Sequence, residues 1–234
     1  MLMNYSKSTL KTFIIRLPLV DLLVGIIVME KTYISAQSLL DMSFELGINI
    51  LKSGFKPKFI IAVWRGGTPV GIAVQEVMDY YGVKSDHIAI RTSSYIGMQQ
   101  QKEVNVHGLE YIINNINAED SLLIIDDVFD SGRSIEALIR ELRHTCRRNT
   151  PDVIKVATVY YRPNKNVTNI KPDFYLKETD DWLVFPHELV GCTKDEIKNA
   201  KNISPSATDG ETLINPSPRT PPKSTRMAMR MTEY

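Results

Sequence analysis

The chain has 234 residues, of which 43% are hydrophobic, so it can bury a core of ordinary size in one domain. Its 28 basic and 27 acidic residues give a formal net charge of +1, so no global field attracts it to nucleic acid or to an anionic membrane. The two cysteines, Cys146 and Cys192, have neither the number nor the spacing of a disulfide framework or a zinc site. They suit a reducing compartment, and we expect a cytoplasmic protein.

The sequence begins with an apolar segment. Residues 13–28 are rich in aliphatic side chains, but Arg16 and Asp21 interrupt them. Charges near the centre of a membrane span are costly, so we do not expect membrane insertion. We interpret residues 1–28 as an extension that packs on the domain, or as one that is not made if translation starts at Met29.

The next elements alternate between helix and strand. Ser35 can cap a helix over the apolar repeat that follows it. Residues 59–63, FIIAV, form a continuous apolar run, as expected for a strand that is covered on both faces. A second helix is predicted to begin at a Thr68 cap, with Pro69 in its first turn, and to end before Gly82.

The second half of the chain continues this alternation. A weaker strand is predicted over residues 87–90, and the polar, glutamine-rich residues 91–106 are interpreted as a mobile loop because they lack clear periodicity. The remaining predicted elements are strands over residues 122–125, 153–161, 173–176 and 182–185, and a helix over residues 134–144. Strands that alternate with helices imply crossover units and a mainly parallel sheet. Ligands of such sheets bind beyond the carboxyl ends of the strands.

The sequence ends in a segment of different composition. Residues 198–234 contain five prolines among many serines and threonines, and few large apolar side chains. This composition is typical of a disordered tail. The folded domain is therefore expected over residues 29–197.

The clearest chemical signal is LLIIDDVFDSGRS, residues 122–134. A buried strand ends in two adjacent carboxylates, Asp126 and Asp127, which can accept hydrogen bonds from vicinal ribose hydroxyls or bind through a divalent ion. An Asp-Asp pair at the end of a strand is often only part of a turn. A functional role is favoured here because a turn of unusual composition, DSGRS, follows the pair closely.

That turn, DSGRS, leads into the helix predicted to start on Ser134. The amides of residues 131–134, the hydroxyls of Ser131 and Ser134, and the positive end of the helix can bind a phosphate monoester. Gly132 lets the backbone come close to the ligand. No GxxxxGK[ST] nucleotide loop occurs in the sequence. A phosphate site beside a diol acceptor indicates a sugar phosphate as ligand.

LLIIDDVFDSGRS resembles the 5-phosphoribosyl-1-pyrophosphate (PRPP) signature of type I phosphoribosyltransferases. Over roughly residues 29–192, four further segments resemble the bacterial xanthine-guanine and hypoxanthine-guanine enzymes. They are AVWRGGTPVG (62–71), TSSY (92–95), YYRPNK (160–165) and DWLVFP (181–186). Five matches in the family's order are more specific than any one alone. The resemblance implies an α/β fold, with a mainly parallel sheet flanked by helices and a small hood of short strands.

The resemblance also assigns residues to the donor. Arg65 and its two glycines would bind the pyrophosphate leaving group, since one fixed cation and unhindered amides suit that anion. The Trp64–Arg65 peptide is expected to be cis. A loop over residues 93–105 should close over the donor and exclude water. The full PRPP set is Arg65, Gly66, Gly67, Ser94, Tyr95, Asp126, Asp127, Ser131, Gly132, Arg133 and Ser134.

Two residues are implied for the chemistry of the acceptor base. Asp130 stands where the family has an aspartate opposite the purine N7, so it is the expected general base or proton shuttle; Arg65 is the second expected catalytic residue. A loop aspartate can also simply cap the turn that follows it. Arg162 takes the place of a family lysine that reads the 6-oxo group, and a guanidinium can donate to the same oxygen. Lys165 is the second candidate for that role.

The base itself would lie against the DWLVFP segment. By resemblance, Trp182 stacks on the purine and backbone groups near Leu183 meet its 2-position, although a lone tryptophan is ordinarily a core residue. His187 stands where the xanthine-guanine enzymes tend to have another aromatic side chain. This departure leaves open the preference among hypoxanthine, guanine and xanthine.

The expected activity is transfer of the 5-phosphoribosyl group from PRPP to N9 of a 6-oxopurine, with release of pyrophosphate, in purine salvage. Magnesium is implied as the cofactor, held indirectly by Asp126 and Asp127. A homodimer or homotetramer is expected, and no nucleic-acid partner. The alternative is a regulator of the same fold that senses PRPP without catalysis.

Overall fold

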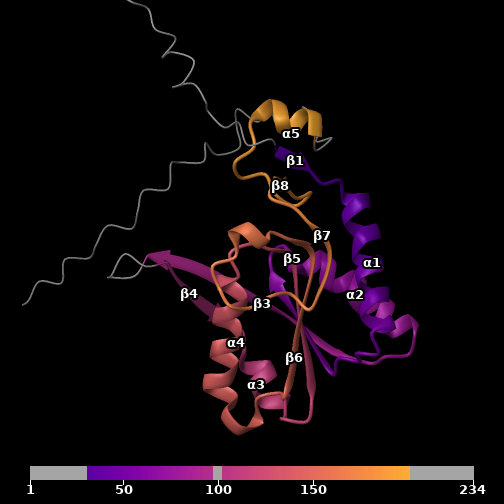
Figure 1. The fold of residues 1–234 in the computed structure, drawn as a ribbon, viewed down its shortest axis with the longest axis vertical. Coiled ribbons are helices and arrows are strands. Elements are labelled where there is room, and N and C mark those ends of the chain that lie inside the picture. The colour runs from indigo at the N-terminus through magenta and orange to yellow at the C-terminus, as the bar shows by residue number, and fades with distance from the viewer. Residues whose placement is uncertain (1–30, 97–101, 201–234) are drawn as a thin grey trace, which may run out of the picture.

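The computed structural model describes residues 31–96 and 102–200 (Figure 1). The predicted extension, residues 1–28, and the predicted tail from residue 201 on lie outside the described residues. Within the described part of the chain, no helix is both long and apolar enough to cross a membrane.

The central feature is a six-stranded sheet in the order β4-β3-β2-β5-β6-β7. Its strands are β2 (Phe59–Trp64), β3 (Asp86–Ile96), β4 (Lys102–His107), β5 (Ser121–Phe129), β6 (Val153–Tyr161) and β7 (Phe174–Glu178). All neighbouring pairs are parallel except β3 and β4, which are antiparallel. The predicted α/β fold with a mainly parallel sheet is confirmed.

Helices cover both faces of this sheet (Figure 1): α1 (Ala36–Lys52) and α2 (Gly67–Tyr80) on one face, α3 (Glu110–Asn115) and α4 (Arg133–Cys146) on the other. In β5, Leu122 and Ile124 pack with α3 and α4, whereas Leu123 and Ile125 pack with α1 and α2. All four are fully buried, and each such side chain stabilises the fold by about 1.5–3 kcal/mol. Burial on both faces is why the strand sequence is continuously apolar.

A second, two-stranded sheet forms the hood, which we define as β1 (Lys31–Tyr33), β8 (Trp182–Val184) and α5 (Lys194–Ala200). The two strands are parallel, with Lys31 opposite Trp182. The ammonium of Lys31 lies 2.9 Å from a carboxylate oxygen of Glu196 in α5. These elements lie together at the top of Figure 1, so the start and the end of the domain form one unit. The helix α5 ends at Ala200.

Three details of the predicted helices can be compared with the structure. Ser35 is the N-cap of α1, and its hydroxyl accepts from the amide of Ser38 at 3.0 Å, as predicted. Thr68 is not the cap of α2. The helix begins two residues earlier, after Gly66, and the Thr68 hydroxyl donates instead to the carbonyl of Arg65. The end of α2 before Gly82 is confirmed.

The prediction of a loop over residues 91–106 was wrong. Most of this segment forms a hairpin in which Arg91 pairs with His107 and Ile96 pairs with Lys102 (β3 and β4). The segment is polar overall, but it also contains β-branched side chains such as Thr92 and Val104, which favour strands. Residues 97–101, between the two strands, lie outside the described residues. Figure 1 shows the hairpin projecting from the body of the domain.

The strand that delivers the paired carboxylates is also longer than predicted. Asp126 and Asp127 lie inside β5, which continues to Phe129, rather than at its end. The strand continues because β6 offers partners along its whole length, with Asp126 opposite Thr158 and Phe129 opposite Tyr161.

Candidate active site

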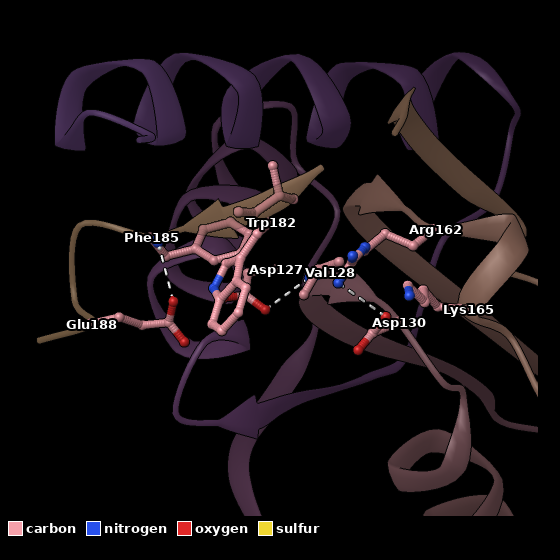
Figure 2. A pocket seen from close by; sticks show the side chains of 9 residues that line it. Asp127, Val128, Asp130, Arg162, Lys165, Trp182, Phe185 and Glu188 are labelled. Atoms are coloured by element: carbon pink, nitrogen blue, oxygen red, sulfur yellow. Dashed lines mark hydrogen bonds and ion pairs between the residues drawn. The ribbon is translucent and has the colours of Figure 1, made fainter. Parts of the chain in front are cut away.

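The site is built where β2, β5 and β6 reach one edge of the sheet and meet the hood (Figure 2). The turn after β2 contributes Gly66, β5 contributes Asp127, and the residue after β6 is Arg162. The hood contributes Trp182. Parallel neighbours place their carboxyl ends at the same edge, so residues far apart in the sequence share one site.

Asp127 lies at the centre of the site and is enclosed by three segments. Its Oδ1 accepts from the amide of Val128 at 2.7 Å, and its Oδ2 lies 3.2 Å from Nε2 of His187. Gly66 lies directly against it, because a Cβ added to that glycine would be 2.1 Å from Oδ2. Only 9% of the Asp127 side chain is exposed. Its carboxylate therefore has a fixed position.

Asp126, next to it, has unusual electrostatics. Burial of its carboxylate and the charge of Asp127 raise the pKa of Asp126 well above its ordinary value. Hydrogen bonds from the backbone amides of Asp127 and Gly67 act in the opposite direction and lower this pKa. A cation or hydroxyl donors near the pair would favour the charged form. Adjacent carboxylates of this kind therefore suit a ligand that carries a positive charge or hydrogen-bond donors.

A cavity of about 70 Å³ lies at the predicted phosphate site. It is lined by Asp126, Val128, Phe129, Asp130, Ser131, Gly132, Ser134 and Ile135. Gly132 has φ +77°, and a Cβ there would lie 2.4 Å from the hydroxyl oxygen of Thr168. Only glycine fits this left-handed, crowded position. The helix α4 begins at Arg133, so its positive end faces the cavity.

A larger cavity of about 500 Å³ adjoins Asp127. Figure 2 shows its lining, which comprises Asp127, Val128, Asp130, Arg162, Lys165, Trp182, Leu183, Phe185 and Glu188. Four segments contribute to it: β5, the turn after it, the segment after β6, and residues 182–188, which begin with the hood strand β8. A volume of this size is typical of small-molecule sites.

Asp130 and Arg162 contact each other at the wall of this cavity (Figure 2). Oδ1 of Asp130 lies 3.3 Å from a guanidinium nitrogen of Arg162, and the other terminal nitrogen donates to the carbonyl of Asp180 at 3.0 Å. The Nε of Arg162 is buried and has no hydrogen-bond partner among the described residues. Arg162 is 14% exposed and Asp130 50% exposed. The aspartate is therefore the more accessible member of the pair.

Trp182 and Leu183 lie on the hood side of the cavity. The indole of Trp182 is half exposed, whereas Leu183 is buried. The ammonium of Lys31 lies 5.8 Å from the centroid of the Trp182 ring, close enough for a cation–π contact. A large exposed aromatic ring at the edge of a cavity is suited to stacking on a planar ligand.

The other predicted donor residues occupy different places. Arg65 is exposed, and the Trp64–Arg65 peptide that precedes it is cis, as expected. Ser94 and Tyr95 lie on the β3–β4 hairpin, where they pair with Val104 and Glu103. They are therefore part of a strand and not of a loop.

Comparison with known proteins gives the family of this chain. The model of the phosphoribosyl transferase domain matches residues 35–190, about two thirds of the sequence. The chain belongs to the phosphoribosyl transferase family. The match covers the segments that form both cavities.

Solved structures of phosphoribosyltransferases have the same fold. A purine phosphoribosyltransferase from Pyrococcus horikoshii is 24% identical, with a TM-score of 0.55 over 71% of this chain and 99% of that one. A xanthine-guanine-hypoxanthine phosphoribosyltransferase from Helicobacter pylori is 20% identical, with a TM-score of 0.54 over 74% and 100%. A hypothetical protein from Neisseria gonorrhoeae with bound ppGpp is 18% identical, with a TM-score of 0.60 over 74% and 97%. No curated protein matches.

The structure adds residues to the site that were not singled out from the sequence. Phe185 and Glu188 line the larger cavity, and a carboxylate oxygen of Glu188 accepts from the amide of Phe185 at 3.2 Å. Val128 lines both cavities. The contact of His187 with Asp127 was also missed. Phe185 lies within the predicted base-binding segment, residues 181–186, and Glu188 lies two residues after it; this position was the one available signal.

The resemblance to phosphoribosyltransferases implies a magnesium ion. No group of three or more His, Cys, Asp or Glu among the described residues could hold a metal ion. Asp126 and Asp127 still offer adjacent carboxylates. Mg²⁺ usually binds one or two carboxylates together with substrate phosphates and water. The residues therefore fit an ion that arrives with a phosphorylated ligand rather than one held by the protein alone.

Proposed function

We propose that this protein transfers the 5-phosphoribosyl group of PRPP to N9 of a 6-oxopurine, forming a nucleoside monophosphate and pyrophosphate. The observation that supports it best is the larger cavity, in which Asp127, the Asp130–Arg162 pair and Trp182 face one space. In that combination, Asp127 suits the ribose hydroxyls, the Asp130–Arg162 pair suits the edge of a purine, and Trp182 suits its face. Hypoxanthine, guanine and xanthine are all candidates.

We assign the smaller cavity to the 5-phosphate of the donor. Its lining by Ser131, Gly132 and Ser134, and the positive end of α4, support this assignment. Arg133 belongs to the same turn and would assist from its exposed position.

The ribose and pyrophosphate of the donor would lie between the two cavities. Asp126 and Asp127 would accept from the ribose hydroxyls, directly or through magnesium. Arg65, with the amides of Gly66 and Gly67, would bind the pyrophosphate. The contact of Gly66 with the carboxylate of Asp127 supports this arrangement, because it joins the pyrophosphate turn to the ribose site. Ser94 and Tyr95 would cover the donor from the hairpin.

The purine would lie in the larger cavity, with its face on Trp182 and its 2-position near the backbone of Leu183. Stacking of a base on an aromatic side chain contributes about 1–3 kcal/mol. Arg162 has only donors, so it favours a 6-oxo oxygen over the 6-amino group of adenine. Lys165 lines the same cavity and is the second candidate for this contact.

In the proposed reaction, N9 of the purine bonds to C1′ of the ribose while the bond from C1′ to the pyrophosphate oxygen breaks. The proton at N7 passes to Asp130. The Asp130–Arg162 pair provides for this step, because the half-exposed aspartate can turn to N7 while Arg162 donates to the 6-oxo oxygen. Arg162 stays in place through its bond to the carbonyl of Asp180. Bound magnesium would supply charge neutralisation for the departing pyrophosphate.

A PRPP-sensing regulator without catalysis is the second candidate. One feature favours it: Asp130 contacts Arg162 at 3.3 Å and must leave that contact before it can accept a proton. We further propose a cytoplasmic homodimer or homotetramer whose domain begins near residue 29 and continues to the end of α5.

The test is a spectrophotometric screen of hypoxanthine, guanine, xanthine, adenine and uracil with PRPP and magnesium, with PRPP affinity measured by calorimetry. Turnover of a 6-oxopurine supports the enzyme. PRPP binding without turnover of any base would favour the sensor. Absence of both turnover and PRPP binding would contradict both candidates.

A further inference from the structure

We infer that His187 is a positioning residue for the donor: it holds the Asp127 carboxylate and links the base-binding hood to the ribose site. This inference rests on the proposed function, because it concerns the same PRPP site. It gives a role to a residue that departs from the aromatic side chain expected there.

The contact with Asp127 is direct. Nε2 of His187 lies 3.2 Å from Oδ2 of Asp127, where an Nε2–H can donate to the carboxylate. Oδ1 already accepts from the amide of Val128. His187 is therefore the partner that fixes the second oxygen. The backbone of Gly66 closes a further side of the same carboxylate, so its rotation is restricted on several sides.

The ring of His187 is itself held by the core. It stacks on Phe185, with ring centroids 5.6 Å apart and planes 16° from parallel. Phe185 is buried and packs edge-on against Tyr160 of β6, at 5.9 Å. Stacking sets the plane of the imidazole, and hence the direction of Nε2. The orientation of Asp127 therefore depends on the packing of residues 182–187 against the sheet.

Residues 182–187 form one short segment that reaches both the base site and the donor site of the proposed active site. Trp182 and Phe185 line the larger cavity, and His187, two residues after Phe185, contacts the carboxylate assigned to the ribose. His187 contacts the ribose carboxylate and is not among the residues that line the larger cavity. Loss of the His187 contact should thus weaken donor binding more than base binding.

Two substitutions separate the hydrogen bond from the ring. His187→Phe keeps an aromatic ring to stack on Phe185 but removes the donor to Asp127. His187→Gln removes the ring but keeps an amide N–H at about the distance of Nε2. Val190→Ala is the control, because Val190 belongs to the same segment and is 84% exposed.

The test is to measure KM for PRPP, KM for the base, kcat and the melting temperature of each full-length variant. His187→Phe should raise the KM for PRPP about tenfold, as expected for a lost hydrogen bond to a charged group, with less than a twofold change in the KM for the base. His187→Gln should recover most of this loss. An unchanged KM for PRPP in His187→Phe, or equal increases in both KM values with no recovery in His187→Gln, would overturn the inference.

The outcome can be told apart from failure of the proposed function. If the wild-type protein turns over no base, the enzyme proposal fails, and the PRPP dissociation constants of the same variants still test the role of His187. A tenfold higher dissociation constant for PRPP in His187→Phe alone would support the inference. Equal dissociation constants in the wild type and His187→Phe would refute it. A wild type that does not bind PRPP would refute both.

Discussion

Substitution of Gly66 by alanine is the sharpest perturbation of the proposed donor site. Gly66 has φ −65° and ψ −35°, which alanine adopts without strain, so the added methyl group alone is tested. That Cβ would lie 2.1 Å from Oδ2, 2.4 Å from Cγ and 2.6 Å from Oδ1 of Asp127. Ordinary contacts of this kind exceed 3.0 Å. Either the carboxylate or the turn must therefore move by about 1 Å, the displacement that costs about 100-fold in a positioned site.

We expect Gly66→Ala to lower kcat/KM for PRPP by about 100-fold. The control is Gly71→Ala, whose Cβ would lie 2.7 Å from Cβ of Ala62, on the inner side of α2. That variant should lose thermal stability but keep its KM for PRPP. Steady-state kinetics with varied PRPP and thermal unfolding of both variants provide the measurement. An unchanged kcat/KM in Gly66→Ala would refute the assignment of Asp127 to the donor.

Three further predictions follow from the site and the hood. Asp130→Asn should lower kcat by about 10²–10⁴ with little change in the KM for PRPP, as expected for loss of a general base; equal turnover would remove its catalytic role. Trp182→Ala should raise the KM for the base by about 5- to 150-fold, the equivalent of 1–3 kcal/mol, whereas an unchanged KM would place the purine elsewhere. Glu196 accepts from the amide of Thr193 and from Lys31, which lower its pKa from 4.5 to about 2. A depressed pKa stabilises the fold above pH 4.5, and this stabilisation is lost as the pH falls toward 2. Melting temperatures between pH 6 and 3 should therefore fall less steeply in Glu196→Gln than in the wild type, and parallel curves would contradict this.

Features that depend on neighbouring residues were predictable from the sequence. The apolar run of β2 indicated a strand buried on both faces, and β6 was placed with its observed bounds. The glycine at residue 132 was assigned to close backbone approach, and its positive φ agrees with that role. Each of these signals lies within one segment of the chain.

Features that depend on distant partners were not predictable. Strand β1 forms only because β8, some 150 residues later, pairs with it. The β3–β4 hairpin alternates between more buried and exposed residues only over short stretches, such as residues 104–107, and its polar composition outweighed this local signal. The contacts of Asp130 with Arg162 and of Asp127 with His187 likewise join separate segments. Hydrophobic periodicity contains no information on such polar pairs.

The most direct test of the central claim is chromatographic detection of the nucleoside 5′-monophosphate formed from each 6-oxopurine. The wild-type protein and Asp130→Asn are incubated with the base, PRPP and magnesium, and the product is compared with that from adenine. We predict a PRPP-dependent monophosphate from at least one 6-oxopurine, none from adenine, and a much slower reaction in the variant. Absence of any monophosphate from all three 6-oxopurines with the wild-type protein would contradict the proposed function.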